Sequence, residues 1–390
     1  MPVLFAAVLV IMGSFAMLLP AIMFVLANLG LSNSFSTPII AVYSLAQFVA
    51  GPQWGRLSDG MGRKPVLVMA LVGGALSYAS MSLFSESAIA LFVSMTMAGF
   101  CAGSLAVVFA AVSDITSEEN RTKGMGLIGA AIGLSFVVGT AIGGSVSGSN
   151  ASEASIVNPA FAAAIACAIG VITVLLFMKE TKSAETAEIE QATQRAGRLD
   201  AFRTVGRHKF LFRLCLLIFG FTFCLALMEP MIPRYINVHF NWGPVEMRNI
   251  FIFIGTILVL VQGTLVGPMA KKFGELTVTR LGLALMGLGL TMLALLPDPT
   301  VLAVALVCTS VGTALFNASA LSMASHNAGA HERGAVLGVA QSMQALGRSF
   351  GPLMTGFMFD THSALPFFVG AGLVGLMLLV IFFSAETESN

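Results

Sequence analysis

The chain has 390 residues, of which 57% are hydrophobic and only 10% are charged, and its formal net charge is +1. Soluble domains carry about 25% charged residues, so this composition excludes an ordinary soluble domain. The balanced charge offers no basic surface for nucleic acid, which excludes a DNA- or RNA-binding protein.

Apolar runs recur twelve times, and each is long enough to cross a bilayer, which takes about 20 apolar residues. We expect spanning helices near residues 3–27, 36–55, 65–84, 88–112, 123–146, 159–178, 209–236, 246–269, 276–296, 300–324, 334–357 and 363–384. The first run has no basic segment before it and no small-residue cleavage site. We therefore expect a retained helix and not a signal peptide.

The longest polar interval, residues 179–208, separates six spans from six and is rich in Glu, Gln, Thr and Arg. This composition predicts a tether with room for one amphipathic helix. We therefore predict four parts, namely an N-terminal six-helix bundle at 1–178, a cytoplasmic linker at 179–208, a C-terminal six-helix bundle at 209–384 and a cytoplasmic tail at 385–390.

The Lys and Arg residues indicate the orientation, because cytoplasmic loops are enriched in them. With the N-terminus in the cytoplasm, most of the 20 Lys and Arg residues fall on the inner side. Arg234 and Arg248 fall outside, and Arg348 falls within a span. The pattern predicts a multi-pass protein of the inner (cytoplasmic) membrane with both termini in the cytoplasm.

The two halves repeat one another at a constant offset of 212 residues, without gaps. This offset pairs Gly51 with Gly263, Gly55 with Gly267, Gly62 with Gly274, Ser113 with Ser325, Arg121 with Arg333, Gly126 with Gly338, Gly139 with Gly351 and Gly144 with Gly356. Duplicated halves around a central cavity are a common arrangement in transporters.

Clusters that carry catalysis or bind metals are missing from the sequence. Five cysteines stand singly in apolar runs without CxxC spacing, at Cys101, Cys167, Cys215, Cys224 and Cys308. The five histidines lie near span ends and make no metal-ligand spacing. We expect neither an enzyme nor a bound metal or organic cofactor.

The loop after the second span, residues 55–65, reads GRLSDGMGRKP. Its glycines permit a tight turn, Asp59 can cap a helix N-terminus, and the basic residues hold the loop at the cytoplasmic face. The alternative interpretation is a plain basic loop.

This loop resembles the signature loop of the major facilitator superfamily. The resemblance implies an all-α membrane protein with twelve transmembrane helices in two pseudo-symmetric six-helix bundles. In that family the loop aspartate faces the start of helix 11, and the arginine pairs with an acid that ends helix 4. The implied conformational latch comprises Gly55, Asp59, Gly62, Arg63, Lys64, Asp114 and Arg333. The second copy of the loop has Lys271 where Asp59 would fall, so we expect a one-sided latch.

Other segments extend the resemblance to the twelve-span drug:proton antiporters. Residues 43–52 (YSLAQFVAGP) are similar to tetracycline exporters. Residues 272–277 (KFGELT) and 351–356 (GPLMTG) resemble quinolone-type multidrug exporters. The resemblance covers essentially the whole chain and implies export of drug-like compounds.

The fifth span is rich in glycine at spacings of three and four, which lets helices approach closely. It resembles the antiporter motif of exporters, although Thr140 stands where that motif usually has proline. The residues of this motif are Gly129, Gly133, Gly139, Gly143 and Gly144. The alternative is general packing of small residues.

Glu229 lies within the seventh span, directly before Pro230. An ionisable group inside a span is costly and by default functional, and a desolvated carboxyl can load and release a proton. Quinolone-type exporters carry a glutamate at a matching place, so the resemblance makes Glu229 the expected proton-coupling residue. The alternative is a glutamate in the outer headgroup layer, paired with Arg234.

Arg348 lies within the eleventh span, where contact with lipid would cost several kcal/mol. We expect it to face the cavity and pair with Glu229 or attract an anionic group. The alternative is hydrogen bonding to carbonyls freed by a break at Gly351 and Pro352. The neutral residues expected to line the cavity are Tyr43, Gln47, Gln262, Asn317, Gln341 and Gln344.

Together these features predict a secondary active transporter that exports small amphipathic compounds by proton antiport with alternating access. It should act as a monomer in the bilayer, with the proton gradient as its energy source. The first half contributes no acid or arginine inside a span, which leaves an uncoupled or proton-coupled exporter or flippase of an endogenous lipid or metabolite as an alternative. A non-transporting membrane receptor or scaffold is a second alternative.

Overall fold

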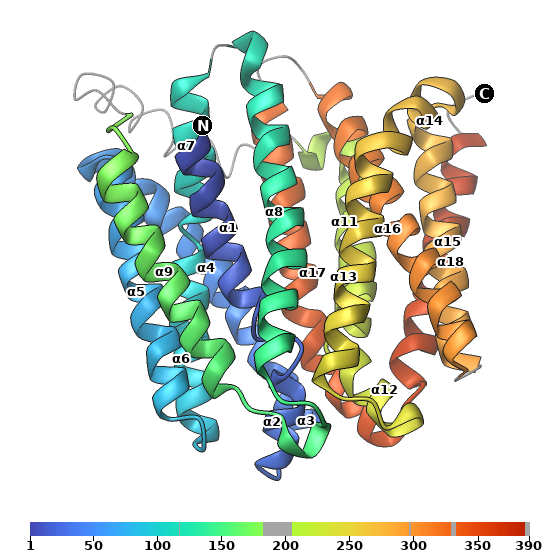
Figure 1. Cartoon of the computed structure of the whole chain (residues 1–390). Helices are drawn as coiled ribbons and strands as arrows, with labels where there is room; N and C mark the ends of the chain where they lie inside the picture. The colour runs from blue at the N-terminus through green and yellow to red at the C-terminus, as the bar shows by residue number, and fades with distance from the viewer. Residues whose placement is uncertain (117, 182–204, 296–297, 329–332, 387–390) are drawn as a thin grey trace. The chain divides into compact units, whose positions relative to one another are not determined.

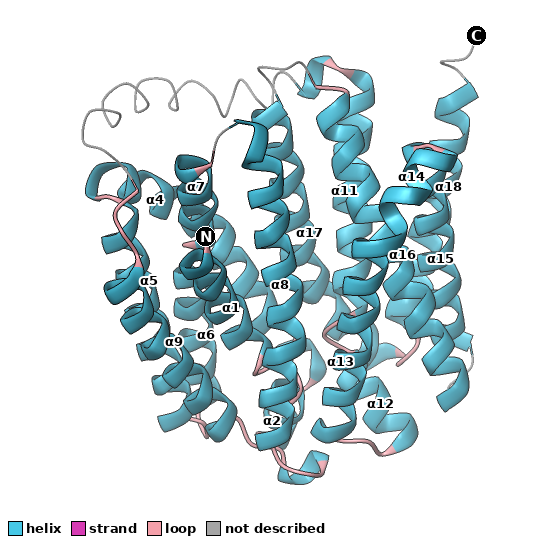
Figure 2. Ribbon diagram, turned by 45° about the horizontal axis from the view of Figure 1, so that its top comes forward, coloured by secondary structure: helices cyan, strands magenta, loops and turns pink. Residues whose placement is uncertain are grey.

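A computed structural model of the whole chain describes all residues except 117, 182–204, 296–297, 329–332 and 387–390. The side chains of residues 118–123, 125–126, 333–335 and 383–386 also lie outside this description. The described residues form helices, turns and loops, with no strand among them (Figure 2). The expected all-α class is confirmed.

The first half of the chain supplies the helices drawn in blue to green in Figure 1. They are α1 Pro2–Ala16, α2 Ile22–Asn28, α3 Asn33–Ser36, α4 Pro38–Met61, α5 Arg63–Leu83, α6 Ala88–Ala102, α7 Leu105–Ile115, α8 Glu118–Val146, the 3-10 helix η1 Ala151–Glu153 and α9 Val157–Phe177.

The second half supplies the helices drawn in yellow-green to red. They are α11 Lys209–Met228, α12 Ile232–Phe240, α13 Pro244–Leu260, the π-helix η3 Val261–Leu265, α14 Val266–Phe273, α15 Glu275–Leu295, α16 Pro299–His326, α17 Arg333–Thr361 and α18 Leu365–Glu386.

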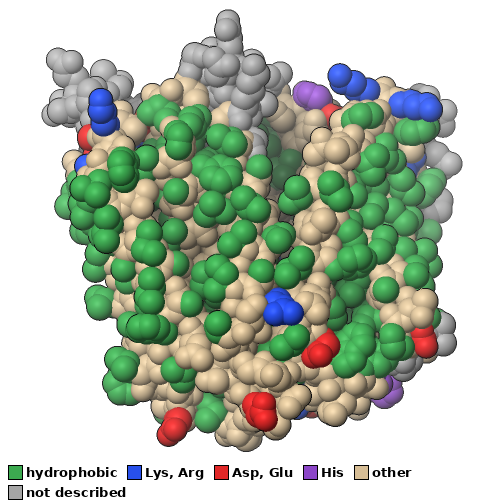
Figure 3. All heavy atoms as spheres, viewed as in Figure 1, with side chains coloured by type: hydrophobic (Ala, Val, Ile, Leu, Met, Phe, Trp, Pro, Cys, Tyr) green, Lys and Arg blue, Asp and Glu red, His purple; other side chains and the backbone are tan. Residues whose placement is uncertain are grey.

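Ten helical stretches of the described chain are long and apolar enough to cross a membrane. The other two expected spans correspond to the broken pair α1 and α2 and to the more polar α17. Large apolar side chains stand exposed along these helices, for example Leu76, Ile89, Phe161 and Leu176. On the face shown in Figure 3 the middle band is mostly hydrophobic, and charged groups lie mostly towards its ends. Such a surface is stable only in lipid, and the chain is a multi-pass membrane protein.

Local sequence explains where several helices begin and end. The Asp298 carboxylate accepts hydrogen bonds from Thr300 N and Val301 N, and Pro299 occupies the first turn of α16. Gly62 ends α4 with φ of 95°, and Gly274 ends α14 with φ of 80°. Both angles favour glycine. These two glycines are equivalent under the 212-residue offset, so the same turn occurs in both halves.

Proline and a π-helix interrupt two spans of the second half. Pro230 has no N–H to donate, and the chain leaves α11 after Met228 and resumes as α12 at Ile232. Five residues of the next span, Val261–Leu265, form η3. The expected break at Pro352 does not occur, because α17 continues through this proline to Thr361.

Contacts between residues divide the chain into two compact units. Unit 1 contains Met1–Thr193 and Pro233–Gly255, and unit 2 contains Gln194–Ile232 and Thr256–Asn390. In unit 1, α1 packs on α8, and α5 packs on α6 and α9. In unit 2, α11 packs on α17, and α15 packs on α16 and α18. The offset converts the first set of pairs into the second, as expected for a duplicated bundle.

Part of the predicted division of the chain stays untested. The expected linker, 179–208, falls largely outside the described residues, and so does most of the tail at 385–390. The bundle boundaries at 178 and 209 therefore remain a prediction. The structure adds that a segment of the second half, Pro233–Gly255, packs within unit 1.

Candidate functional site

The signature loop of unit 1 contains a cluster around Arg63, which we call the Arg63 cluster (Ser58, Asp59, Arg63 and Asp114). Asp114 is exposed, and the other three residues are buried. The Arg63 guanidinium lies 2.7 Å from Asp59 Oδ1 and 2.9 Å from Asp114 Oδ2, and it donates to Ser58 Oγ at 2.6 Å. Arg63 is only 4% exposed, and a buried charge requires such partners. The expected pairing of Arg63 with Asp114 is confirmed.

The other predicted latch residues lie around this cluster. Lys64 Nζ donates to the Leu175 carbonyl at 2.8 Å, which ties the start of α5 to the end of α9. Gly55 has open space where a side chain would begin. The side chain of Arg333 lies outside the described part of the chain, so its predicted role in the latch remains untested.

The structure also shows a contact that the sequence did not indicate. Glu180, just after α9, accepts hydrogen bonds from Arg63 N at 2.8 Å and Lys64 N at 3.1 Å. A carboxylate at this place satisfies free N–H groups of α5 and complements the helix dipole. Gly62 leaves the room, since a methyl group there would collide with the Glu180 carboxylate. The chain that leaves the first bundle is thereby attached to the signature loop.

The glycines of α8 face two different neighbours in unit 1. A methyl group at Gly139 would collide with Gly13 and Ala16 of α1, and one at Gly143 would overlap the Met17 carbonyl. A methyl group at Gly144 would collide with Arg248 of α13. Gly129 has open space around it.

Arg248 also donates to Ser145 Oγ at 3.0 Å. The glycine-rich helix therefore allows close packing both against α1 and against the segment of the second half that belongs to unit 1. Interfaces between helices with small residues permit such approach.

Glu229 and Arg348 form the charged part of a polar surface in unit 2. Glu229 stands at the end of α11, protein atoms surround it, and its side chain is nonetheless exposed. Arg348 on α17 is also exposed and lies within electrostatic range of the Glu229 carboxylate.

Close packing of α17 on α11 produces this proximity. A side chain at Gly347 would meet Phe219 O at 2.8 Å, and one at Gly351 would meet Ala226 Cβ at 2.6 Å. Thr355 Oγ1 donates to the Leu227 carbonyl at 3.1 Å, just before the turn at Glu229. The glycines on either side of Arg348 thus let the two helices touch.

The neutral residues expected to line the cavity differ in how exposed they are. Gln341 and Gln262 are exposed, and Gln262 lies in the π-helix η3, a type of irregularity that often marks functional sites. Gln344 is buried and donates to Asn317 Oδ1 at 3.3 Å. These four residues belong to the same unit as Glu229 and Arg348.

In unit 1 the expected cavity residues lie differently. Gln47 is half-buried, whereas Tyr43 is only 3% exposed and stacks on Phe15 with ring centroids 4.0 Å apart. The structure therefore places Tyr43 in the core of unit 1. Polarity alone could not reveal this, because a tyrosine ring packs as readily as it binds ligands.

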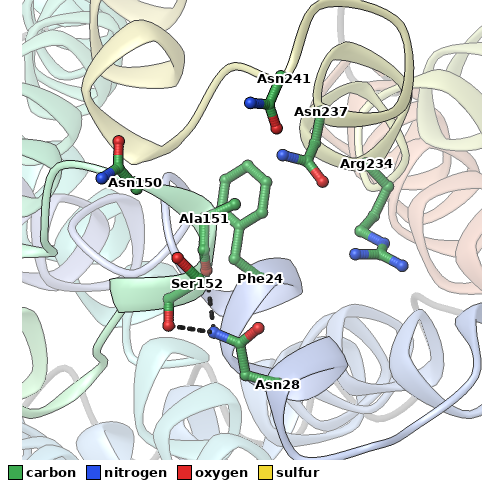
Figure 4. Close-up of a pocket in the computed structure, with 8 residues that line it drawn as sticks. All are labelled: Phe24, Asn28, Asn150, Ala151, Ser152, Arg234, Asn237 and Asn241. Carbon is green, nitrogen blue, oxygen red and sulfur yellow. Dashed lines mark hydrogen bonds between the residues drawn. The ribbon is translucent and has the colours of Figure 1, made fainter.

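A polar pocket of about 500 Å³ lies in unit 1, on the side that the positive-inside pattern places outside (Figure 4). It is lined by Phe24, Asn28, Asn150, Ala151, Ser152, Arg234, Asn237 and Asn241. Asn28 Nδ2 donates to the Ala151 carbonyl at 2.9 Å, and Arg234 Nε donates to Asn33 Oδ1 at 3.2 Å. These bonds connect α12 and η1 to the first helices of the chain, so the pocket lies where these segments of unit 1 are joined.

Comparison with known proteins gives consistent results over nearly the whole chain. The family model for the Major Facilitator Superfamily matches residues 4–352 and 250–390. Tetracycline resistance protein, class H, of Pasteurella multocida is 27% identical over 363 residues, covering 90% of this chain and 88% of that protein. Multidrug resistance protein 2 of Bacillus subtilis (strain 168) is 27% identical over 368 residues, covering 92% of this chain and 89% of that protein.

Solved structures agree in fold. The crystal structure of the human organic anion transporter MFSD10 (TETRAN) matches with a TM-score of 0.73 at 23% identity and covers 97% of this chain and 98% of that one. The crystal structure of the nucleoside transporter NupG matches with a TM-score of 0.72 at 15% identity and covers 97% of each chain.

Proposed function

Because the chain belongs to the Major Facilitator Superfamily, we propose that it is a secondary active transporter that exports small amphipathic compounds in exchange for protons. The observation that carries this proposal is the exposed Glu229 carboxylate, surrounded by protein and within electrostatic range of Arg348. The similarity to proteins named for tetracycline and multidrug resistance supports the substrate class.

Glu229 and Arg348 suit proton exchange because one proton changes their interaction. A proton that reaches Glu229 from outside neutralises the carboxylate and removes its attraction to Arg348. Loss of that proton to the cytoplasm restores the attraction. Binding of the substrate is coupled to binding of the proton if the two ligands favour opposite states of this pair. Each ligand shifts the equilibrium between the two states by its preference for one of them. The proton gradient is the energy source.

We also propose the membrane, the orientation and the oligomeric state in which the protein acts. We place it in the inner membrane as a monomer, with both termini in the cytoplasm and with the Arg63 cluster on the cytoplasmic side. The two units alternate access to a polar site near the middle of the membrane, as transporters with duplicated halves do.

Efflux from liposomes tests the exchange. Purified protein is reconstituted, a pH gradient is imposed, and the efflux of a fluorescent amphipathic dye is followed. Glu229→Gln should lose gradient-driven efflux by at least about ten-fold, since it cannot bind and release the proton. Glu86→Gln makes the same chemical change in an exposed residue between α5 and α6 and should leave efflux unchanged. Full coupling in Glu229→Gln would remove the proposed role.

One observation favours a second candidate, namely uncoupled export or flipping of an endogenous lipid or metabolite. The buried charged side chains described in the chain are Asp59 and Arg63, both at the signature loop. The apolar spans of the first half also contain no acid that could share proton coupling with Glu229. Transport by reconstituted protein without a pH or sodium gradient would favour this function over antiport.

A further inference from the structure

Unit 2 contains an ionic contact that resembles the Arg63 cluster in position but not in chemistry. Glu275 is the first residue of α15, and His326 is the last residue of α16. His326 Nδ1 lies 3.1 Å from Glu275 Oε1, and Ser322 Oγ donates to the same carboxylate oxygen. The start of α15 is thus connected to the last turn of α16.

The 212-residue offset relates the two contacts residue by residue. It pairs Arg63 with Glu275 and Asp114 with His326. The preceding turns also correspond, since Gly62 N donates to Ser58 O at 3.1 Å and Gly274 N donates to Ala270 O at 3.0 Å. The same backbone geometry therefore presents a contact between equivalent helices in both units.

The charges of the second contact are inverted. Arg63 is replaced by an acid, Asp114 by a histidine and, at the third position, Asp59 by Lys271. We call Glu275, Ser322 and His326 the inverted cluster. The expectation of a one-sided latch stays a prediction, and the structure adds that the second half has a contact between equivalent helices, with the acid and the base exchanged.

The exchange changes how the contact responds to pH. A guanidinium is charged at every physiological pH, so the Arg63 cluster is permanently ionic. An imidazole changes its charge between about pH 5 and 8, so the Glu275–His326 contact is ionic only when His326 is protonated. A neutral imidazole can at most share a hydrogen bond with the carboxylate.

We propose that the inverted cluster is a proton-dependent latch, in which protonation of His326 strengthens the tie between the start of α15 and the end of α16 and its deprotonation weakens that tie. The physiological role of this latch rests on the proposed transport function. The strength of this contact in unit 2 depends on the pH at this end of the unit. The strength of the equivalent contact in unit 1 does not. Glu275 and His326 are positioning residues in this proposal and need not touch the substrate.

Several basic residues lie on the helices that pack on α15 and α16, whereas His331 and Glu332, which follow α16 in the chain, lie outside the described residues. Lys271 and Lys272 lie on α14, which packs on both α15 and α16, and Lys272 Nζ stands over the Phe273 ring at 5.2 Å. Arg280 of α15 donates to the Ile381 carbonyl. Lys209 and Arg213 lie on α11, which also contacts α16. On α17, the side chain of Arg333 lies outside the described part.

Thermal unfolding of the purified full-length protein in detergent tests the latch without requiring transport. His326→Gln should lower the Tm by about 1–2 °C near pH 5.5 and leave it unchanged near pH 8, since exposed ion pairs contribute modestly. His326→Arg should hold the Tm at its acid value at both pH values, because it recreates the permanent charge of Arg63.

Two further variants make this test specific. Glu275→Gln combined with His326→Gln should show no more loss than either single variant, as expected for partners in one contact. His208→Gln, a matched change at an exposed histidine before α11 that makes no side-chain capping bond, should have no pH-dependent effect of this kind. A Tm that responds equally at both pH values, or not at all, would overturn the latch.

A transport experiment distinguishes failure of the latch proposal from failure of the proposed export function. In liposomes that perform dye efflux, the rate of efflux should vary with the pH on the side where the latch lies. His326→Arg should reduce this variation at least about two-fold relative to the unaltered protein. An unchanged pH profile overturns the role in transport. Protein that shows the pH-dependent Tm shifts but transports no dye retains the latch and loses the proposed export.

Discussion

Arg63 Nε lies 2.9 Å from Asp114 Oδ2, so the first residue of α5 is held at the last turn of α7. The same guanidinium also contacts Asp59 at the end of α4. One side chain thus joins α4, α5 and α7 at the signature loop.

Removal of Arg63 should therefore destabilise unit 1 substantially. Arg63→Ala removes the cation beside the buried Asp59 carboxylate, and loss of one partner of a buried pair costs about 3–5 kcal/mol. We expect a clear fall in Tm of the purified protein. Combining Arg63→Ala with Asp59→Asn should recover part of that loss, because the buried acid then carries no charge. Equal Tm values for Arg63→Ala and the unaltered chain would contradict the structure of this cluster.

The capping contact of Glu180 predicts a smaller, local effect. Glu180→Ala should free the amides of Arg63 and Lys64, at a cost of about 0.5–2 kcal/mol for a lost helix cap. Hydrogen–deuterium exchange of the peptide that contains residues 62–66 should become faster, while peptides from the middle of α5 should be unaffected. Glu153→Ala, an exposed acid in η1, is the matched control and should leave exchange of residues 62–66 unchanged.

The sequence predicted the spans, the duplication and the Arg63–Asp114 pair, because each depends on strong local signals or on a recognisable motif. It did not predict Glu180 as a cap, since the acid and the helix it caps are separated by 117 residues. Local patterns report a cap only when it lies in the residues that directly precede the helix.

The inverted cluster was missed for a different reason. The offset of 212 residues is visible from matching glycines. A search for identical residues in the two halves does not find a pair in which the acid and the base have exchanged places. Glu275 and His326 preserve a contact and share no residue type with Arg63 and Asp114. Tyr43 shows the converse error, because a polar residue on a presumed cavity helix packs on Phe15 in the core.

The packing of α8 on α1 predicts opposite outcomes for two Gly→Ala changes in one helix. At Gly143 the added methyl group overlaps the Met17 carbonyl, and overpacking of this kind costs about 1–3 kcal/mol. At Gly129 the surroundings are open, so the higher helix propensity of alanine should keep or raise stability by up to about 1 kcal/mol. Yield and Tm of the two purified variants measure this difference. If both variants behaved alike, the close contact of α1 and α8 would be refuted.

The relationship between Glu229 and Arg348 predicts that their effects on transport are not additive. Arg348→Gln leaves the Glu229 carboxylate without the cation that attracts it, so gradient-driven dye efflux should fall by roughly ten-fold, as expected for a functional charge inside a span. Glu229→Gln together with Arg348→Gln should be no slower than Glu229→Gln alone, because the second change then removes a partner that no longer acts. Residues in contact show interaction energies of about 0.5–3 kcal/mol in such cycles. Arg213→Gln, an exposed arginine on the same helix α11, is the control and should transport normally. Independent, additive losses from the two changes would mean that Glu229 and Arg348 act separately, and proton exchange would then have to be assigned to Glu229 without its arginine.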